Sequence, residues 1–223
     1  MGEKVLLTEK ILDLDRGRTL LDFCREEETE IILGTRENLT VVLLPRAIAT
    51  RKKLTVYLKG DGSRVEILGL VVGGEGEEYQ LDIRTIHQGL NTSAHAIVRG
   101  VLFESSRLNF SGMIKIEKGA NKTLSLLENR VLVLGEAAKA NSLPSLEIEA
   151  DDVKASHAAT IGRVDAAALF YLQSRGLSRQ NAISLLSEGF FEPILRKLAG
   201  SQMVKEVRQQ IWRSLSKQLK KKN

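Results

Sequence analysis

The sequence predicts a mainly β body followed by a helical tail. From Glu30 onward, runs of about 4–8 residues rich in Val, Ile and Leu alternate with Gly-rich or polar turns, as short strands do. After residue 162 the apolar residues recur at helical steps of three and four instead. Aromatic residues make up only 4% of the chain, which favours many short strands over a bulky aromatic core.

The chain divides into a short N-terminal segment (1–30), a β core (31–162) and a C-terminal helical region (163–223). The segment from Val5 to Pro45 is ambiguous between a short helix and strand pieces. Beyond it, strands recur about every 8–12 residues, which is typical of a sandwich, a barrel or a coiled β-solenoid. Alternation in Met113-Ile-Lys-Ile-Glu predicts strands with one buried face.

Three helices are predicted, over Val164–Arg175, over Arg179–Glu188 and from Pro193 onward, where proline suits a first helical turn and a break is expected at Gly200. Residues with N-cap chemistry precede the first two, and a glycine follows each as the expected C′ residue. These capping residues are Asp165 and Gly176, then Ser178 and Gly189.

Charge and composition exclude several classes of protein. The formal net charge of +5 is concentrated in the tail from Lys205 to Lys222, and the remainder is close to neutral. A nucleic-acid-binding protein would carry its basic patch on the folded body, so none is expected here. No apolar run reaches the roughly 18–20 residues of a membrane span, and no signal peptide is evident. The single Cys24 excludes an internal disulfide. We expect a soluble, cytoplasmic protein.

Several motifs in a fixed order resemble one known family. Between residues 143 and 190 they are Leu143-Pro-Ser-Leu-Glu-Ile, Asp151-Asp-Val-Lys-Ala-Ser-His-Ala-Ala-Thr-Ile-Gly, Phe170-Tyr-Leu-Gln-Ser-Arg-Gly and Gly189-Phe. Upstream they are His87, Asn91-Thr-Ser, Arg99-Gly-Val-Leu, Phe110-Ser-Gly and Ile114-Lys-Ile. This set resembles the SufB/SufD scaffold proteins of the SUF iron–sulfur cluster assembly system. The resemblance implies a right-handed β-helix (β-solenoid) core followed by C-terminal helices.

The sequence also departs from this family. Members are usually much longer, and we expect this SufD-like chain to lack most of their N-terminal helical domain. SufB-type sequences have a cysteine where Asn129 or its neighbours stand, and many SufD-type sequences have one at Ala155. His157 is kept, with flanks that are closer to SufD than to SufB.

The resemblance implies that His157 is the candidate cluster ligand at a subunit interface. An iron–sulfur cluster commonly takes four ligands, mostly cysteine thiolates. This chain has one Cys and three widely spaced His, so it cannot hold a conventional cluster alone. A transient cluster at a subunit interface would take His157 as one metal ligand and the others from a SufB-like subunit or a second copy. Without the resemblance, a lone strand histidine has a structural role by default.

The family resemblance also implies that the helical end docks the SUF ATPase, SufC, an ABC-type ATPase. The candidate contact residues are Phe170, Tyr171, Arg175, Gly176 and Phe190. Clustered aromatics suit interface anchors. The alternative is that the aromatics seal the end of the β core and that Arg175 caps its own helix.

The other polar candidates have simpler explanations. Cys24 sits among apolar residues as a small buried side chain would. His87 and His95 lie on predicted strands, where a structural role is expected, and Asp151-Asp152 suits a turn. We therefore predict a scaffold component that is not an enzyme. The alternative is a structural or regulatory β-helix binding module without cluster chemistry; a polysaccharide-cleaving enzyme is a more distant one.

Overall fold

The computed structural model describes residues 10–14, 17–22, 24, 27–45, 49–198 and 201–220, and it consists of twelve strands followed by three helices. The strands are β1 (Lys10–Leu14), β2 (Gly17–Asp22), β3 (Glu28–Leu33), β4 (Asn38–Leu43), β5 (Ala49–Leu58), β6 (Arg64–Gly73), β7 (Glu78–His87), β8 (Ser93–Leu102), β9 (Arg107–Ile116), β10 (Thr123–Val133), β11 (Lys139–Ile148) and β12 (Val153–Arg163). The helices are α1 (Ala166–Ser174), α2 (Arg179–Leu195) and α3 (Ser201–Lys220).

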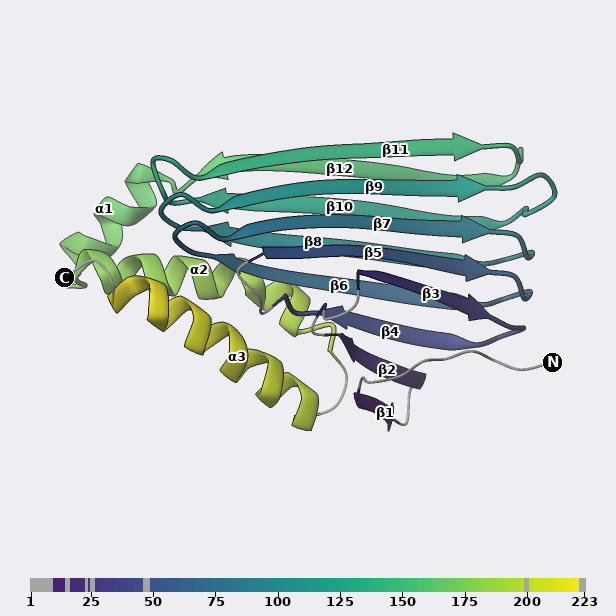
Figure 1. Ribbon diagram of the computed structural model, residues 1–223, viewed down its shortest axis with the longest axis horizontal. Coiled ribbons are helices and arrows are strands. Elements are labelled where there is room, and N and C mark those ends of the chain that lie inside the picture. The colour runs from purple at the N-terminus through teal and green to yellow at the C-terminus, as the bar shows by residue number, and fades with distance from the viewer. Residues whose placement is uncertain are drawn as a thin grey trace.

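The strands form two facing sheets, with successive strands alternating between them (Figure 1). One sheet has the order β1-β2-β4-β6-β8-β10-β12, and the other has β11-β9-β7-β5-β3. Apart from β1 and β2, all paired neighbours are parallel. Such parallel pairing of strands from successive coils, with one strand per sheet in each coil, confirms the β-solenoid.

The ambiguous N-terminal segment is strand where the structure describes it. β1 and β2 form an antiparallel hairpin, and β2 continues the parallel sheet through β4. The helix considered for this segment is therefore wrong over residues 10–14 and 17–22. β2 forms a strand because it pairs with β4. This contact cannot be predicted from the local sequence of the short apolar segment. The division of the chain at residues 30 and 162 stays a prediction.

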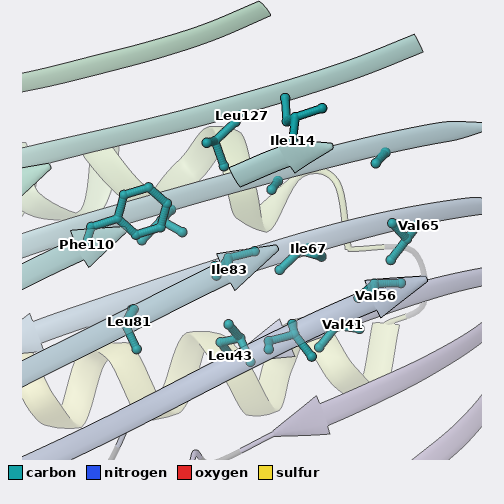
Figure 2. Close-up of a cluster of buried hydrophobic side chains, with 14 of the residues drawn as sticks. Val41, Leu43, Val56, Val65, Ile67, Leu81, Ile83, Phe110, Ile114 and Leu127 are labelled. Carbon is teal, nitrogen blue, oxygen red and sulfur yellow. The ribbon is translucent and has the colours of Figure 1, made fainter. Parts of the chain in front are cut away.

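The interior of the solenoid is filled by the alternate residues that point inward from both sheets (Figure 2). On β6 these residues are Val65, Ile67 and Val71, and they face Ile83 and Phe110 across the interior. Each coil stacks its aliphatic side chains on those of the next, so the core runs the length of the body. Removing this apolar surface from water is the main term that holds the coils together.

A second core lies on the outside of the larger sheet, under α2 and α3 (Figure 1). Strand residues that point outward, such as Leu68, Leu70 and Ile97, pack against Phe191 and Ile194 of α2. From α3 the buried residues are Val207, Ile211 and Leu215. The sheet is therefore covered on both faces where α2 and α3 lie, which explains the nearly continuous burial along β6.

Two predicted helix boundaries are wrong. α2 passes through Gly189 and ends at Leu195, with Pro193 inside the helix, and the third helix begins at Ser201. A helix that continues past Gly189 buries Phe191, Ile194 and Leu195 against the sheet, and this burial stabilises it. Pro193 has no N–H to donate to the carbonyl of Gly189, so the helix gives up one hydrogen bond at this turn. The N-caps Asp165 and Ser178 are confirmed, with side chains that accept from Ala167 N and Asn181 N.

No helix in the described parts of the chain combines the length and apolar character needed to cross a membrane.

Candidate functional site

His157 lies on β12, the last strand of the larger sheet. Its partner in the register is Leu127 on β10, and its side chain is exposed. Val153 and Ala155 on the same strand pack partly against the interior cluster. The two-residue period of a strand therefore directs His157 to this interior side, at the rim where the solenoid ends.

The solenoid ends with two long strands that have a partner on one side only. β11 pairs with β9 and β12 pairs with β10, and no other described strand pairs with either. Figure 1 shows both at the edge of the body farthest from β1 and β2. Since β12 spans 11 residues and β11 spans 10, these edges present long rows of backbone groups that are open to another strand.

Apolar side chains also lie exposed along this end. Leu143 is 62% exposed, Ile161 is 46% exposed and Ile148 is 44% exposed. In the preceding coil the equivalents of Ile161 and Ile148 are Val131 and Ile116, which are buried. The end of the solenoid thus exposes core-type residues because the next coil is absent from the described chain. We call the surface of β11 and β12 the open end.

Ala155 and Asn129, where the resemblance implies cysteines in other family members, lie on β12 and on its neighbour β10. Ala155 is half-buried against the interior cluster. Asn129 is 1% exposed, pairs in register with Ala159 on β12, and donates from Nδ2 to Ser142 Oγ at 2.9 Å. Its Oδ1 has no hydrogen-bond partner among the described residues. These side chains offer no thiolate, and no group of three His, Cys, Asp or Glu residues in the described part could hold a metal ion.

The first helix presents the exposed aromatic residues. α1 has no buried residue, and Phe170 and Tyr171 are 73% and 56% exposed. Arg175 is the C-cap, and its guanidinium lies 5.2 Å from the Tyr171 ring centroid. Gly176 follows with a φ of +90°, which reverses the chain toward α2. The structure therefore brings four of the five docking candidates together on one projecting helix and its end.

Phe190 lies apart from this group, on α2 over β8. Its ring packs against the outer core, and the Arg99 guanidinium lies 5.2 Å from the ring centroid. Arg99 also donates to the Phe190 carbonyl and forms an ion pair with Glu128 at 3.6 Å. Burial is the main cause that lowers the pKa of Arg99. Sequence reasoning missed Arg99 as the link between α2 and the sheet, although it begins one of the family motifs.

The remaining histidines have structural surroundings. His87 is buried, with Nδ1 at 2.8 Å from Thr92 Oγ1 and Nε2 at 3.1 Å from Ser125 Oγ. Burial lowers its pKa to about 4, so the imidazole is neutral at pH 7. His95 is half-buried on the outer face of β8, and burial, followed by the charge of Lys197, lowers its pKa.

The other two candidates also have ordinary positions. Cys24 is buried in the interior cluster, in a left-handed conformation with a φ of +54°. Asp151 and Asp152 form the exposed bend before β12.

Sequence reasoning also missed a groove between α2 and α3. Leu177, Leu185 and Trp212 line it together with Glu188, and its volume is about 500 Å³. Trp212 and Leu185 are 43% and 49% exposed. The helical period of α2 and α3 places these residues at the edge of the buried faces. The groove itself forms only where the two helices pack against each other.

Comparison with known proteins identifies the family. A family model described as "SUF system FeS cluster assembly, SufBD core domain" matches residues 31–190. The chain is 38% identical to the iron–sulfur cluster assembly protein SufD of Bacillus subtilis over 144 residues, which are 65% of this chain and 33% of that protein. It is 28% identical to SufB of B. subtilis over 149 residues, 67% of this chain and 32% of the relative.

A third relative gives the same result. Identity to SufD of Escherichia coli is 29% over 157 residues, 70% of this chain and 37% of that protein. The chain thus spans roughly a third of the length of these relatives. The parallel β-solenoid, the ordered motifs and the family match over residues 31–190 agree with one another. This protein belongs to the SufBD core-domain family of the SUF system for iron–sulfur cluster assembly.

Proposed function

We propose that the chain is a component of the SUF scaffold on which iron–sulfur clusters are assembled. It docks the SufC ATPase through α1 and contributes His157 at an interface made by the open end. The observation that carries this proposal is the position of His157, exposed on an edge strand that pairs only with β10, at the end of the solenoid. A histidine buried in the coil, such as His87, could not meet a group from another subunit.

This chain has too few cluster ligands near His157, so a second subunit must contribute to the interface. A cluster commonly takes four ligands, mostly thiolates. The described residues near His157 offer Asn129, Ser142 and Ala155, none of which is a cluster ligand of that kind. His157 therefore supplies one ligand to a cluster in transit, and another subunit supplies the rest. The cluster is cargo of the assembled complex and is not held by this chain alone.

The docking half of the proposal is supported by the exposed aromatics of α1. Phe170 and Tyr171 leave most of their surface in water, which is unusual for large apolar side chains on a helix of nine residues. A helix this short needs packing to be stable, and α1 has none of its own residues buried. A partner that covers Phe170 and Tyr171 would provide that packing and would anchor on aromatic side chains.

A capture experiment with the SufC of the same organism tests the docking. Wild-type protein should retain SufC, and Phe170→Ala with Tyr171→Ala should lose it. The matched control is Ile32→Ala, which truncates a side chain that is 59% exposed on β3, away from the helices. Circular dichroism should show the same fold and unfolding midpoint for all three proteins. Loss of binding in the control, or no binding by the wild type, would contradict the docking.

Anaerobic reconstitution with iron and sulfide tests the role of His157. The chain alone should take up no stable cluster, and the complex with SufC and a SufB-like subunit should. His157→Ala should lower the cluster absorbance of the complex, whereas Ser156→Ala on the opposite face of β12 should not. Equal yields from both variants would favour the alternative, a binding module without cluster chemistry, which the lack of nearby thiolates supports.

A further inference from the structure

We propose that the outer face of α3 binds the surface of an anionic membrane. α3 packs on the larger sheet as part of the second core, so its basic residues stand on the folded body (Figure 1). Three features carry this inference. They are the charge of the helix, the side on which its unpaired cations lie, and an exposed apolar tip beside them. The inference goes beyond the proposed function and does not depend on His157 or α1.

α3 is strongly basic. It carries five basic residues and one acidic residue, Glu206. Two of the basic residues have acidic partners, since Arg208 lies 3.0 Å from Glu192 and Lys217 lies 4.0 Å from Glu77. The other three form no ion pair with any residue in the described part of the chain, and they are Lys205, Arg213 and Lys220. These three charges are therefore available to an anionic partner.

The unpaired cations lie on the side of α3 that faces away from the sheet. With about 100° of rotation per residue, one arc of about 100° holds the three cations and Trp212, all of which are exposed. The buried residues lie on the opposite side of the helix and are Val207, Ile211 and Leu215. Lys205, Arg213 and Lys220 thus extend over about 22 Å along an outer ridge of the body. We call these three residues the basic ridge.

An apolar tip stands beside the basic ridge. Trp212 is 43% exposed, and Leu185 on the neighbouring α2 is 49% exposed. Both line the groove between the two helices. Glu188 is the acidic residue that lines this groove, and it accepts a hydrogen bond from Ser184 Oγ at 3.0 Å. An indole ring and an aliphatic side chain next to lysines are the side chains that favour the level of lipid headgroups.

An anionic membrane fits this combination better than a nucleic acid or an acidic protein does. Nucleic-acid phosphates would neutralise the basic ridge, but they would leave Leu185 in water. A membrane surface offers phosphates and, just beneath them, acyl chains that cover apolar side chains. An acidic protein would have to match a convex helix whose cationic side chains have no described partner that holds them in place. A fluid lipid surface adapts to such a shape.

Charge complementarity sets the size of the effect. Each Lys or Arg near an anionic leaflet strengthens binding about fivefold. The three residues of the basic ridge should therefore favour anionic over zwitterionic lipid about a hundredfold. Added salt should weaken the binding, because the attraction is screened over about 10 Å at 0.1 M.

Co-sedimentation with vesicles tests the basic ridge. Wild-type protein should bind vesicles of phosphatidylcholine with phosphatidylglycerol and should not bind phosphatidylcholine alone. The triple variant Lys205→Gln, Arg213→Gln, Lys220→Gln should bind about a hundredfold more weakly. The matched control is a second triple variant that loses the same net charge from exposed sites outside the helices, namely Lys59→Gln, Lys118→Gln, Lys139→Gln.

The control variant should bind like wild type, and circular dichroism should show one fold and one unfolding midpoint for all three proteins. Equal losses in the two triple variants would mean that net charge alone attracts the protein, which would overturn the proposal. Absence of wild-type binding to the anionic vesicles would overturn it as well.

Fluorescence tests the apolar tip, because Trp212 is the single tryptophan of the chain. Anionic vesicles should shift its emission to shorter wavelength, and brominated acyl chains should quench it. Leu185→Ser should weaken binding about fivefold by removing a side chain that the lipid covers. Ile32→Ser, at a site on β3 that is 59% exposed, should leave binding unchanged. Vesicle binding without a shift of Trp212 emission would contradict the contact described.

Two soluble polyanions decide between the classes of partner. A single-stranded oligonucleotide and polyglutamate are added to the wild-type protein in place of vesicles. Neither should shift the emission of Trp212 as the anionic vesicles do. A shift with either polyanion and none with the vesicles would assign the basic ridge to that other class and would overturn the membrane proposal.

Discussion

The buried imidazole of His87 makes the stability of the solenoid sensitive to acid. Both ring nitrogens are engaged by hydroxyl groups, with Thr92 Oγ1 at 2.8 Å and Ser125 Oγ at 3.1 Å. A hydroxyl can donate or accept, so this arrangement satisfies the neutral ring in either tautomer. Burial lowers the pKa of His87 from 6.5 to about 4. Protonation in the folded state is therefore unfavourable.

The size and sign of the effect follow from this pKa difference. In the unfolded chain the imidazole takes up a proton below about pH 6.5, whereas in the folded protein it does so only near pH 4. Between these values the unfolded state binds more protons, so the free energy of unfolding decreases as the pH falls. At about 1.36 kcal/mol for each pKa unit, the loss relative to pH 7 is about 2 kcal/mol at pH 5 and about 3 kcal/mol at pH 4.

Urea denaturation at pH 7, 6, 5 and 4 measures this loss. His87→Gln keeps a polar group that does not titrate, so the variant should be less stable than wild type at pH 7 but should lose less stability on acidification. The difference between the two pH profiles isolates His87 from the carboxylates, which titrate in both proteins. Gln88→Ala, at the exposed neighbouring position, should follow the wild-type profile. Parallel profiles for wild type and His87→Gln would refute the reasoning.

Three further substitutions test the packing of the body. Lys52 and Asp22 form a buried ion pair at 2.6 Å, and Lys52→Met should cost about 3–5 kcal/mol by leaving a buried carboxylate unpaired, with much of it regained by adding Asp22→Asn. Gly112→Ala should cost about 1–3 kcal/mol, because a Cβ there would lie within 2.4 Å of the Leu127 side chain, whose movement disturbs the last coils. Phe191→Ala should cost about 3–5 kcal/mol by opening a cavity between α2 and the sheet. Chemical denaturation measures the free energy of unfolding of all three variants. Changes near zero relative to wild type would contradict the packing described.

Local sequence predicted the elements whose signal is local. Alternation of apolar residues marked the strands from Glu30 onward, and Asp165 and Ser178 marked the starts of α1 and α2 because a capping side chain acts within three residues of itself. Gly189 and Pro193 misled the same reasoning. Their local preference for a helix boundary is outweighed by burial of Phe191 and Ile194 against strands such as β8, more than 80 residues away in sequence.

Local patterns are enough to predict a β body with a helical end, and the ordered motifs, which include His157, are enough for the resemblance to SufB/SufD. The surroundings of His157, by contrast, depend on how the strands are arranged in space. The same alternation that buries Val131 leaves Ile161 exposed, since burial depends on whether another coil follows and not on the residue. Likewise, the position of β12 at the end of the coil leaves one of its edges without a partner strand. The local sequence cannot show this, because parallel strands pair through contacts distant in sequence.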